Sequence, residues 1–80
     1  MTVDAVMQVV ADALKVNRNR ISMDSSIDTV EGWDSLIQLD ILAKIDKETK
    51  GKAAGIRELA ISLSVKTIVQ ALRNNGLIDG

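Results

Sequence analysis

The sequence predicts an all-α protein, an antiparallel four-helix bundle made of three main helices, one short helix and a long first loop. Apolar residues recur at spacings of three and four over most of the chain, which is the period of an amphipathic helix. The segments between these stretches are rich in Asn, Ser, Asp and Gly, which favour turns. Short antiparallel bundles suit a pattern of this kind.

The first helix is expected over residues 3–16. Thr2 is its expected N-cap, Asp4 in the first turn complements the helix dipole, and Asn17 is the expected end. Several valines weaken the local helix propensity, but the spacing of the apolar residues still predicts a helix. The expected apolar face consists of Val3, Val6, Met7, Val10 and Leu14.

Residues 17–33 form the expected long loop, because they show no sustained period and are rich in turn-forming residues. Three isolated apolar residues, Ile21, Ile27 and Trp33, are expected to hold this loop against the helices. A loop of this length is uncommon in a small domain and is often functional.

The second helix is expected over residues 35–49, with Asp34 as its cap and Lys47 and Lys50 at its C-terminal end. At 100° per residue, Leu36 and Ile37 fall outside the arc expected to face the core. That arc consists of Leu39, Ile41, Leu42, Ala43 and Ile45, and the opposite arc consists of Asp40, Lys44, Lys47 and Glu48.

The sequence predicts two more helices in the last third of the chain. Residues 56–62 are expected to form one or two helical turns. Residues 65–74 are expected to form a longer helix, capped by Ser64 and ended by a left-handed turn at Asn75-Gly76. Its expected core face consists of Val65, Ile68, Val69 and Leu72.

Length and composition limit the functional classes. Eighty residues predict a single domain, residues 1–80. A net charge of −1 argues against nucleic-acid binding, and no apolar run is long enough to span a membrane. The start of the chain lacks signal-peptide features, so a cytoplasmic protein is expected. The protein is also expected to be a monomer. The chain has no Cys, no His and no calcium-loop pattern, so no metal site is expected.

The most informative motif is Gly32-Trp33-Asp34-Ser35-Leu36, at the start of the second helix. Ser35 has no histidine or cysteine partner anywhere in the chain, so no base is available to make it a nucleophile. Its position, where helix N–H groups are unpaired and the dipole is positive, would stabilise an attached phosphodiester. The motif therefore indicates a residue to which a group is attached, and the protein is not expected to be an enzyme.

At this motif the chain resembles the acyl carrier proteins, which carry 4′-phosphopantetheine on the serine of an Asp-Ser-Leu motif at the start of their second helix. The specific match covers residues 31–36, and the pattern of elements extends it over most of the chain. The resemblance implies that a phosphopantetheinyl transferase modifies Ser35. It also implies that acyl intermediates travel on the arm as thioesters, from a loading enzyme to a downstream synthase or transferase of a fatty-acid, polyketide or other specialised acyl pathway.

The resemblance also implies a partner-binding surface, made of Asp34, Leu36, Ile37 and Asp40. The matching aspartate of the family, here Asp34, also helps to bind a metal ion in the complex with the transferase. Fatty-acid carriers are strongly acidic along the second helix, whereas this chain mixes acids with Lys44 and Lys47 and has Ile37 where an acid is common. A nearly neutral carrier is expected to dock through a more apolar face and to serve a dedicated pathway.

Two alternatives stay open from the sequence. The first is a peptidyl or D-alanyl carrier, charged with an amino acid by an adenylating enzyme. The second is a helical protein-interaction module in which Ser35 is unmodified and only helps to start the helix. A further hypothesis concerns the core, which would part to admit an acyl chain between the helices. The residues named for that pocket are Val6, Val10, Leu39, Leu42 and Ile68.

Overall fold

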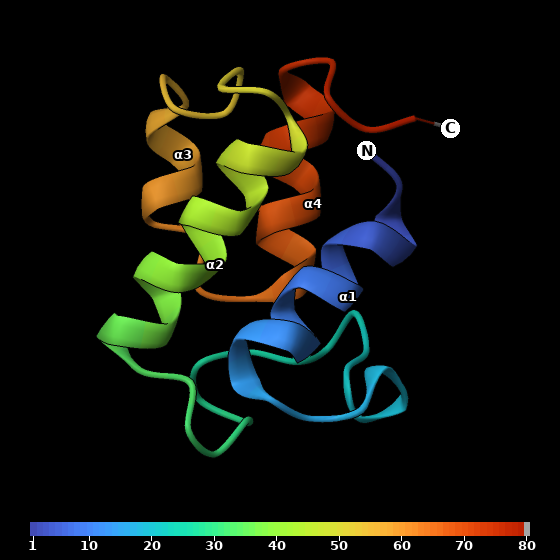
Figure 1. Ribbon diagram of the computed structural model, residues 1–80, viewed down its shortest axis with the longest axis vertical. Helices are drawn as coiled ribbons and strands as arrows, with labels where there is room; N and C mark the ends of the chain where they lie inside the picture. The colour runs from blue at the N-terminus through green and yellow to red at the C-terminus, as the bar shows by residue number, and fades with distance from the viewer. Residues whose placement is uncertain (80) are drawn as a thin grey trace.

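Four α-helices make up about half of the protein, and the computed structural model describes residues 1–79 (Figure 1). The helices are α1, Val3–Leu14; α2, Ser35–Glu48; α3, Arg57–Ala60; and α4, Val65–Asn74. No strand occurs among the described residues, and the only extended pairing found there is an isolated bridge between Ser26 and Ser64. The expected helical class, with three main helices and one short one, is confirmed.

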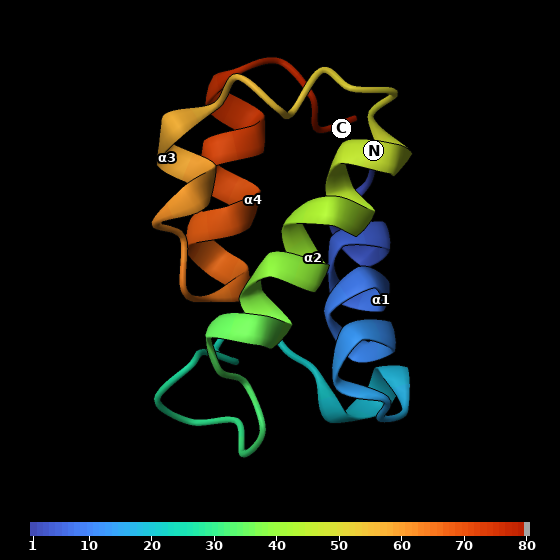
Figure 2. The same ribbon diagram turned by 60° about the vertical axis from the view of Figure 1, so that its left-hand side comes forward.

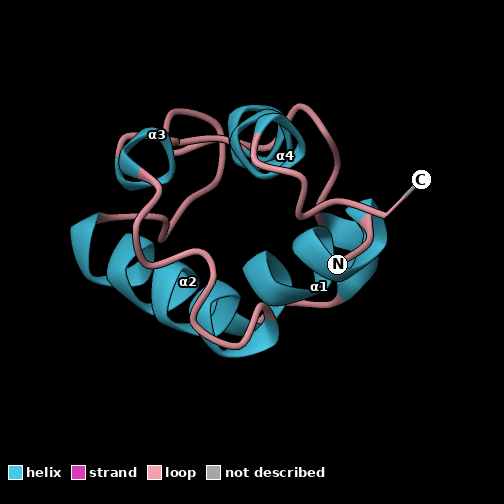
Figure 3. Ribbon diagram, turned by 90° about the horizontal axis from the view of Figure 1, so that it is seen from above, coloured by secondary structure: helices cyan, strands magenta, loops and turns pink. Residues whose placement is uncertain are grey.

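The helices lie in two pairs when the molecule is seen from above (Figure 3). Helix α1 packs against α2 and also against α4, and the single turn of α3 lies beside α4 (Figure 2). The two ends of the described chain meet next to α1, where the Met1 ammonium donates to Asp79 Oδ2 at 2.9 Å and the Asp79 N–H donates to the Met1 carbonyl at 2.7 Å. None of the helices within residues 1–79 is both long and apolar enough to cross a membrane.

Helix α1 begins as predicted and ends two residues early. The Thr2 hydroxyl accepts from the Ala5 N–H at 3.0 Å, which satisfies one unpaired N–H of the first turn. The helix ends at Leu14 because Lys15 adopts a left-handed conformation, with φ 58°. The predicted end at Asn17 is therefore wrong. The Val16 N–H bonds back to the Ala11 carbonyl at 3.0 Å, as in helix ends closed by a left-handed residue.

The core face of α2 differs from the predicted arc. Gln38 and Thr49 are buried, so the buried face follows the spacing 38, 41, 45 and 49. Leu39, the residue after Gln38, does not belong to this face and is 63% exposed. Gln38 can be buried because its amide is hydrogen-bonded on both sides, as described below. Among the residues of the expected arc, Leu39 and Ala43 lie at the surface and Ile41 and Ile45 are fully buried.

The core is aliphatic apart from Trp33 and combines residues from every main helix. Ile41, Val10 and Leu72 have no exposed surface, and they represent α2, α1 and α4. Helix α4 has the predicted bounds and the predicted cap, since the Ser64 hydroxyl accepts from the Thr67 N–H at 3.1 Å. The buried residues of α4 are Val65, Ile68, Val69, Ala71 and Leu72.

The long first loop is held as predicted. Ile21 and Trp33 are buried, and Ile27 packs against the core while partly exposed. The loop also contains a short 3-10 turn, Arg18–Arg20, which the sequence did not indicate. Its middle pairs with the segment before α4, because the Ile27 N–H donates to the Leu63 carbonyl at 2.9 Å. These contacts place the end of the loop, and with it Ser35, in a fixed position.

Candidate attachment site at the start of helix α2

Ser35 is the first residue of α2 and its side chain is exposed. Within residues 1–79 no hydrogen bond is found to its hydroxyl, and no partner is found for the backbone N–H groups of Ser35 and Leu36. Asp34 is the N-cap, as predicted, and its Oδ1 accepts from the Ile37 N–H at 3.0 Å. The hydroxyl is thus accessible, beside N–H groups that favour an anion.

The turn before the helix depends on a glycine. Gly32 has φ 90°, a conformation that residues with a side chain rarely adopt. Glycine is therefore favoured at this position. After this turn the chain carries Trp33 into the core, where only 4% of its surface is exposed. Burying Trp33 and exposing Ser35 two residues later is the local result of the Gly-Trp-Asp-Ser sequence.

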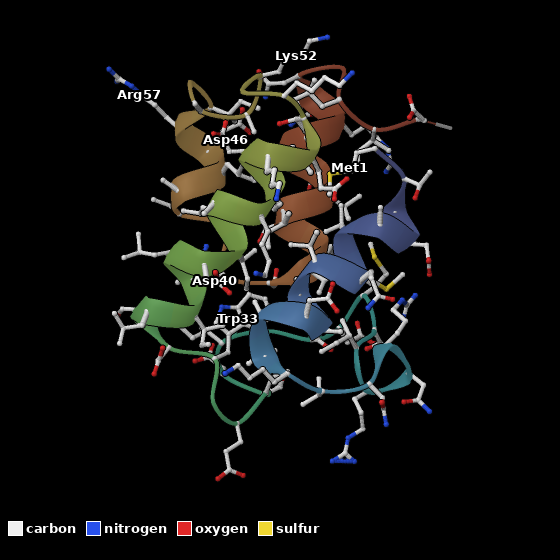
Figure 4. The ribbon with its side chains drawn as sticks, viewed as in Figure 1. Met1, Trp33, Asp40, Asp46, Lys52 and Arg57 are labelled. Carbon is white, nitrogen blue, oxygen red and sulfur yellow. The ribbon has the colours of Figure 1, made fainter. Side chains whose placement is uncertain are left out.

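A buried amide connects this turn to the segment before α4. Trp33 Nε1 donates to Gln38 Oε1 at 2.9 Å, and Gln38 Nε2 donates to the Ser62 carbonyl at 2.8 Å. Gln38 lies one helical turn after Ser35, so its hydrogen bond to the Ser62 carbonyl holds that segment beside the start of α2. Figure 4 shows Trp33 beside the start of α2. The sequence analysis did not identify Gln38. The signal for it was the spacing of three to Ile41 and seven to Ile45 on the buried face.

Large apolar side chains are exposed on both sides of this contact. Leu36 and Leu39, on the first two turns of α2, are 76% and 63% exposed. Ile61 and Leu63, on either side of Ser62, are 80% and 42% exposed. We call these four residues the apolar rim. Only Leu36 was predicted to be exposed, because Leu39 had been assigned to the core and residues 56–62 to helical turns, whereas α3 ends at Ala60.

The other residues predicted to bind partners lie differently. Ile37 is half-buried and packs against the core, so the expectation that it lies outside the core arc is wrong. Ile37 lies one helical turn before Ile41, which is fully buried, so the two side chains share a face of α2. Asp40 is half-buried and forms an ion pair with Lys44, with 3.4 Å between Lys44 Nζ and Asp40 Oδ2. The cation one turn away therefore offsets the negative charge of Asp40.

Among residues 1–79 no three or more acidic side chains gather closely enough to hold a metal ion. Comparison of the chain with protein-family models, with curated proteins and with solved structures found no significant match. The arrangement at Ser35 itself is therefore the basis for a functional proposal.

Proposed function

We propose that the protein is a carrier in which Ser35 bears a 4′-phosphopantetheine arm and acyl groups ride on that arm as thioesters. The observation that carries the proposal is the position of Ser35, exposed at the first residue of α2 beside unpaired N–H groups. A phosphodiester there gains from the helix dipole and from N–H groups that have no other partner. The acyl-carrier type of antiparallel bundle is part of this proposal.

The absence of Cys and His from the sequence agrees with this role. The arm supplies the thiol that the chain lacks, and the transferase supplies the base that activates the Ser35 hydroxyl. In the transfer, the Ser35 oxygen forms a bond to the β-phosphorus of coenzyme A while the pyrophosphate bond breaks. The serine proton goes to the base of the transferase, and 3′,5′-adenosine bisphosphate leaves.

The apolar rim suits a partner that binds mainly by apolar contact. Leu36 and Ile61 are the most exposed large apolar side chains in the described part of the chain, and they flank the start of α2. Asp40 is paired with Lys44, so its charge contributes less to steering a basic partner. We infer a dedicated loading enzyme and a downstream synthase or transferase of a specialised acyl pathway. An aminoacyl cargo, as in peptidyl or D-alanyl carriers, fits the same arrangement.

A second candidate function is an unmodified interaction module. The apolar rim favours it, because exposed apolar residues gathered in one place often mark a protein–protein contact. In that case Ser35 would only help to start α2.

One experiment separates the two. The protein is incubated with coenzyme A and a broad-specificity phosphopantetheinyl transferase, and its intact mass is measured. The carrier proposal expects a gain of one phosphopantetheine that is absent in Ser35→Ala. It expects the full gain in Ser22→Ala, a matched change at another exposed serine. A folded protein that gains no mass would favour the interaction module.

A further inference from the structure

An open groove lies at the C-terminal end of α1, where the chain turns into the long first loop. Its walls are formed by Lys15, Val16, Asn17 and Arg20. The groove has a volume of about 480 Å³, which is in the range of small-molecule sites. Three of the four residues that line it are polar or charged, so the groove suits a polar ligand.

The lining of this groove carries positive charge and no negative charge. Between Asp12 and Asp24 the chain has three charged residues, and all of them are cations: Lys15, Arg18 and Arg20. No ion pair to Lys15 or Arg20 is found within residues 1–79. Two exposed cations therefore line the groove without a counter-ion from the described part of the chain.

The third cation, Arg18, holds the shape of the groove. Its Nε and Nη2 donate to Asp4 Oδ1 at 3.0 and 2.7 Å, and its Nη1 donates to the Ile21 carbonyl at 3.0 Å. The Arg20 N–H donates to the Asn17 carbonyl at 3.0 Å. These bonds fasten the short 3-10 turn to α1, so the backbone of the groove is ordered before a ligand binds. Such preorganisation lowers the entropic cost of binding.

Lys15 occupies a position that is unfavourable for a lysine. Its φ is 58°, in the left-handed region where glycine is the usual residue at a helix end. The sequence thus has a cation where glycine would make the fold more stable. Residues held in such conformations cluster at functional sites. A function of the Lys15 side chain, which lines the groove, explains why a lysine occupies this position.

The groove lies at the same end of the molecule as Ser35. Figures 1 and 2 show the C-terminal end of α1 and the long first loop at the end where α2 begins. A Cβ atom on Gly32 would lie 3.9 Å from Leu14 Cδ2, so the last turn of α1 lies beside the turn that precedes Ser35. The groove is therefore on the α1 side of the proposed attachment point.

We propose that this groove binds the phosphate group of a phosphorylated ligand. Arg20 presents a planar fork of donors that matches two phosphate oxygens, and Lys15 supplies a second positive charge. The Asn17 side chain makes no capping bond to the 3-10 turn and adds an uncharged donor. A phosphate dianion uses both cations, whereas one carboxylate of a protein partner carries a single charge.

Three sources can supply such a group: inorganic phosphate, the 3′-phosphate of coenzyme A and the headgroup of an anionic phospholipid. Only the coenzyme A source rests on the carrier function proposed above, because coenzyme A is the donor of the arm. The phosphate site itself does not depend on modification of Ser35.

The test follows the amide chemical shifts of Val16, Asn17 and Arg20 in the unmodified chain, with no transferase present. Sodium phosphate is titrated at constant ionic strength, which is balanced with sodium chloride, and we expect saturable shifts. Coenzyme A is compared with dephospho-coenzyme A, which lacks the 3′-phosphate. Sedimentation with phosphatidic acid vesicles is compared with sedimentation with phosphatidylcholine vesicles. A preference of about tenfold within either pair identifies the source, and equal affinity within both pairs assigns the site to inorganic phosphate.

Lys15→Gly separates loss of binding from loss of folding. It removes one cation and is expected to make the fold more stable, so weaker binding cannot come from unfolding. We expect the Kd for phosphate to rise by about tenfold in Lys15→Gly and by a similar factor in Arg20→Gln, because each removes a charge-assisted hydrogen bond. Lys66→Gln removes an exposed cation from α4 and should leave this Kd unchanged.

The outcomes are distinct. Shifts that rise linearly with phosphate, or a Kd that is the same in Lys15→Gly as in the wild type, overturn the phosphate site. The cations would then only complement the helix dipole at the end of α1. Saturable binding that weakens in both groove variants supports the site. Because the gain of phosphopantetheine at Ser35 is measured separately, failure of the carrier function leaves this result unchanged, and failure of the phosphate site leaves the carrier function standing.

Discussion

Trp33 Nε1 donates a hydrogen bond to Gln38 Oε1 at 2.9 Å, and both side chains are almost fully buried. The same amide donates to the Ser62 carbonyl at 2.8 Å. One side chain thus connects the turn before Ser35 to the segment that carries Ile61 and Leu63. The relative position of the proposed attachment point and the apolar rim depends on this amide.

Gln38→Leu is expected to destabilise the protein by at least about 2 kcal/mol. The leucine fills a similar volume but leaves the buried indole N–H and the Ser62 carbonyl without partners, and each such loss amounts to about 1–3 kcal/mol. Urea unfolding followed by the fluorescence of Trp33, the only tryptophan, measures the change. Gln70→Leu is the matched control on the exposed face of α4 and should stay within about 0.5 kcal/mol. Equal stability of the two variants would contradict the role of the Gln38 amide.

The sequence allowed the helices to be predicted because their apolar spacing and caps are local. Ser64 begins α4 and Asp34 caps α2, as expected from residue type alone. The end of α1 was missed because Lys15 takes a left-handed conformation that lysine does not favour. This conformation of Lys15 is stabilised by contacts of the residues that follow the helix, such as the hydrogen bond from the Val16 N–H to the Ala11 carbonyl.

The candidate site was only partly predictable. Ser35 follows from a short motif at a helix start, so sequence sufficed to place it at the first residue of α2. The spacing of Gln38 to Ile41 and Ile45 is that of a core residue, but the two hydrogen bonds that allow its burial come from the Trp33 indole and the Ser62 carbonyl, in two other segments. The expected core arc included Leu39 and left out Gln38, whereas Leu39 is exposed and Gln38 is buried.

Ser64→Ala is expected to lower the free energy of unfolding by about 1 kcal/mol. The Ser64 hydroxyl accepts from the Thr67 N–H at 3.1 Å, and the Thr67 hydroxyl accepts from the Ser64 N–H at 3.2 Å. Alanine at position 64 leaves the Thr67 N–H unpaired. Ser64→Gly should be affected by only a few tenths of a kcal/mol, since glycine is a tolerated cap. Chemical denaturation of the two variants compares them, and a glycine variant less stable than the alanine one would refute this account.

Lys15→Gly is expected to stabilise the protein by up to about 1 kcal/mol. A left-handed residue other than glycine is unfavourable by about 1–2 kcal/mol, and the greater freedom of glycine in the unfolded chain offsets part of the gain. Lys15 is exposed, so few other contacts change. Lys66→Gly, within α4, is the control and should destabilise by about 1 kcal/mol. The midpoint of thermal unfolding should rise for the first variant and fall for the second.

Leu36→Asp and Ile61→Asp are expected to raise the KM of the phosphopantetheinyl transferase for this protein by about tenfold each. Central apolar residues of an interface contribute on the order of 1–2 kcal/mol, and 1.4 kcal/mol is a factor of ten. Both side chains are exposed, so the free energy of unfolding should change by less than about 0.5 kcal/mol. Asn74→Asp adds one negative charge at the far end of α4 and should leave KM unchanged. Unaltered KM in both test variants would show that the rim is not the docking surface.

The contact between the chain ends should make stability depend on pH. The Met1 ammonium, hydrogen-bonded to Asp79 Oδ2 at 2.9 Å, lowers the pKa of the Asp79 carboxyl below its ordinary value of 3.8. Because the pKa is lower in the folded state, this contribution to stability is fully present above the unfolded pKa. It is lost as the pH falls through the folded pKa.

Asp79→Asn should therefore be less stable than the wild type at pH 6, and the difference should shrink as the pH falls below the ordinary pKa of Asp79. Urea unfolding of both proteins at a series of pH values measures it, and high salt should reduce it because Asp79 is exposed. Asp28→Asn removes an exposed carboxylate that has no ion pair within residues 1–79 and controls for net charge. A difference between Asp79→Asn and the wild type that grew as the pH fell would mean that the Met1–Asp79 contact does not hold the chain ends together.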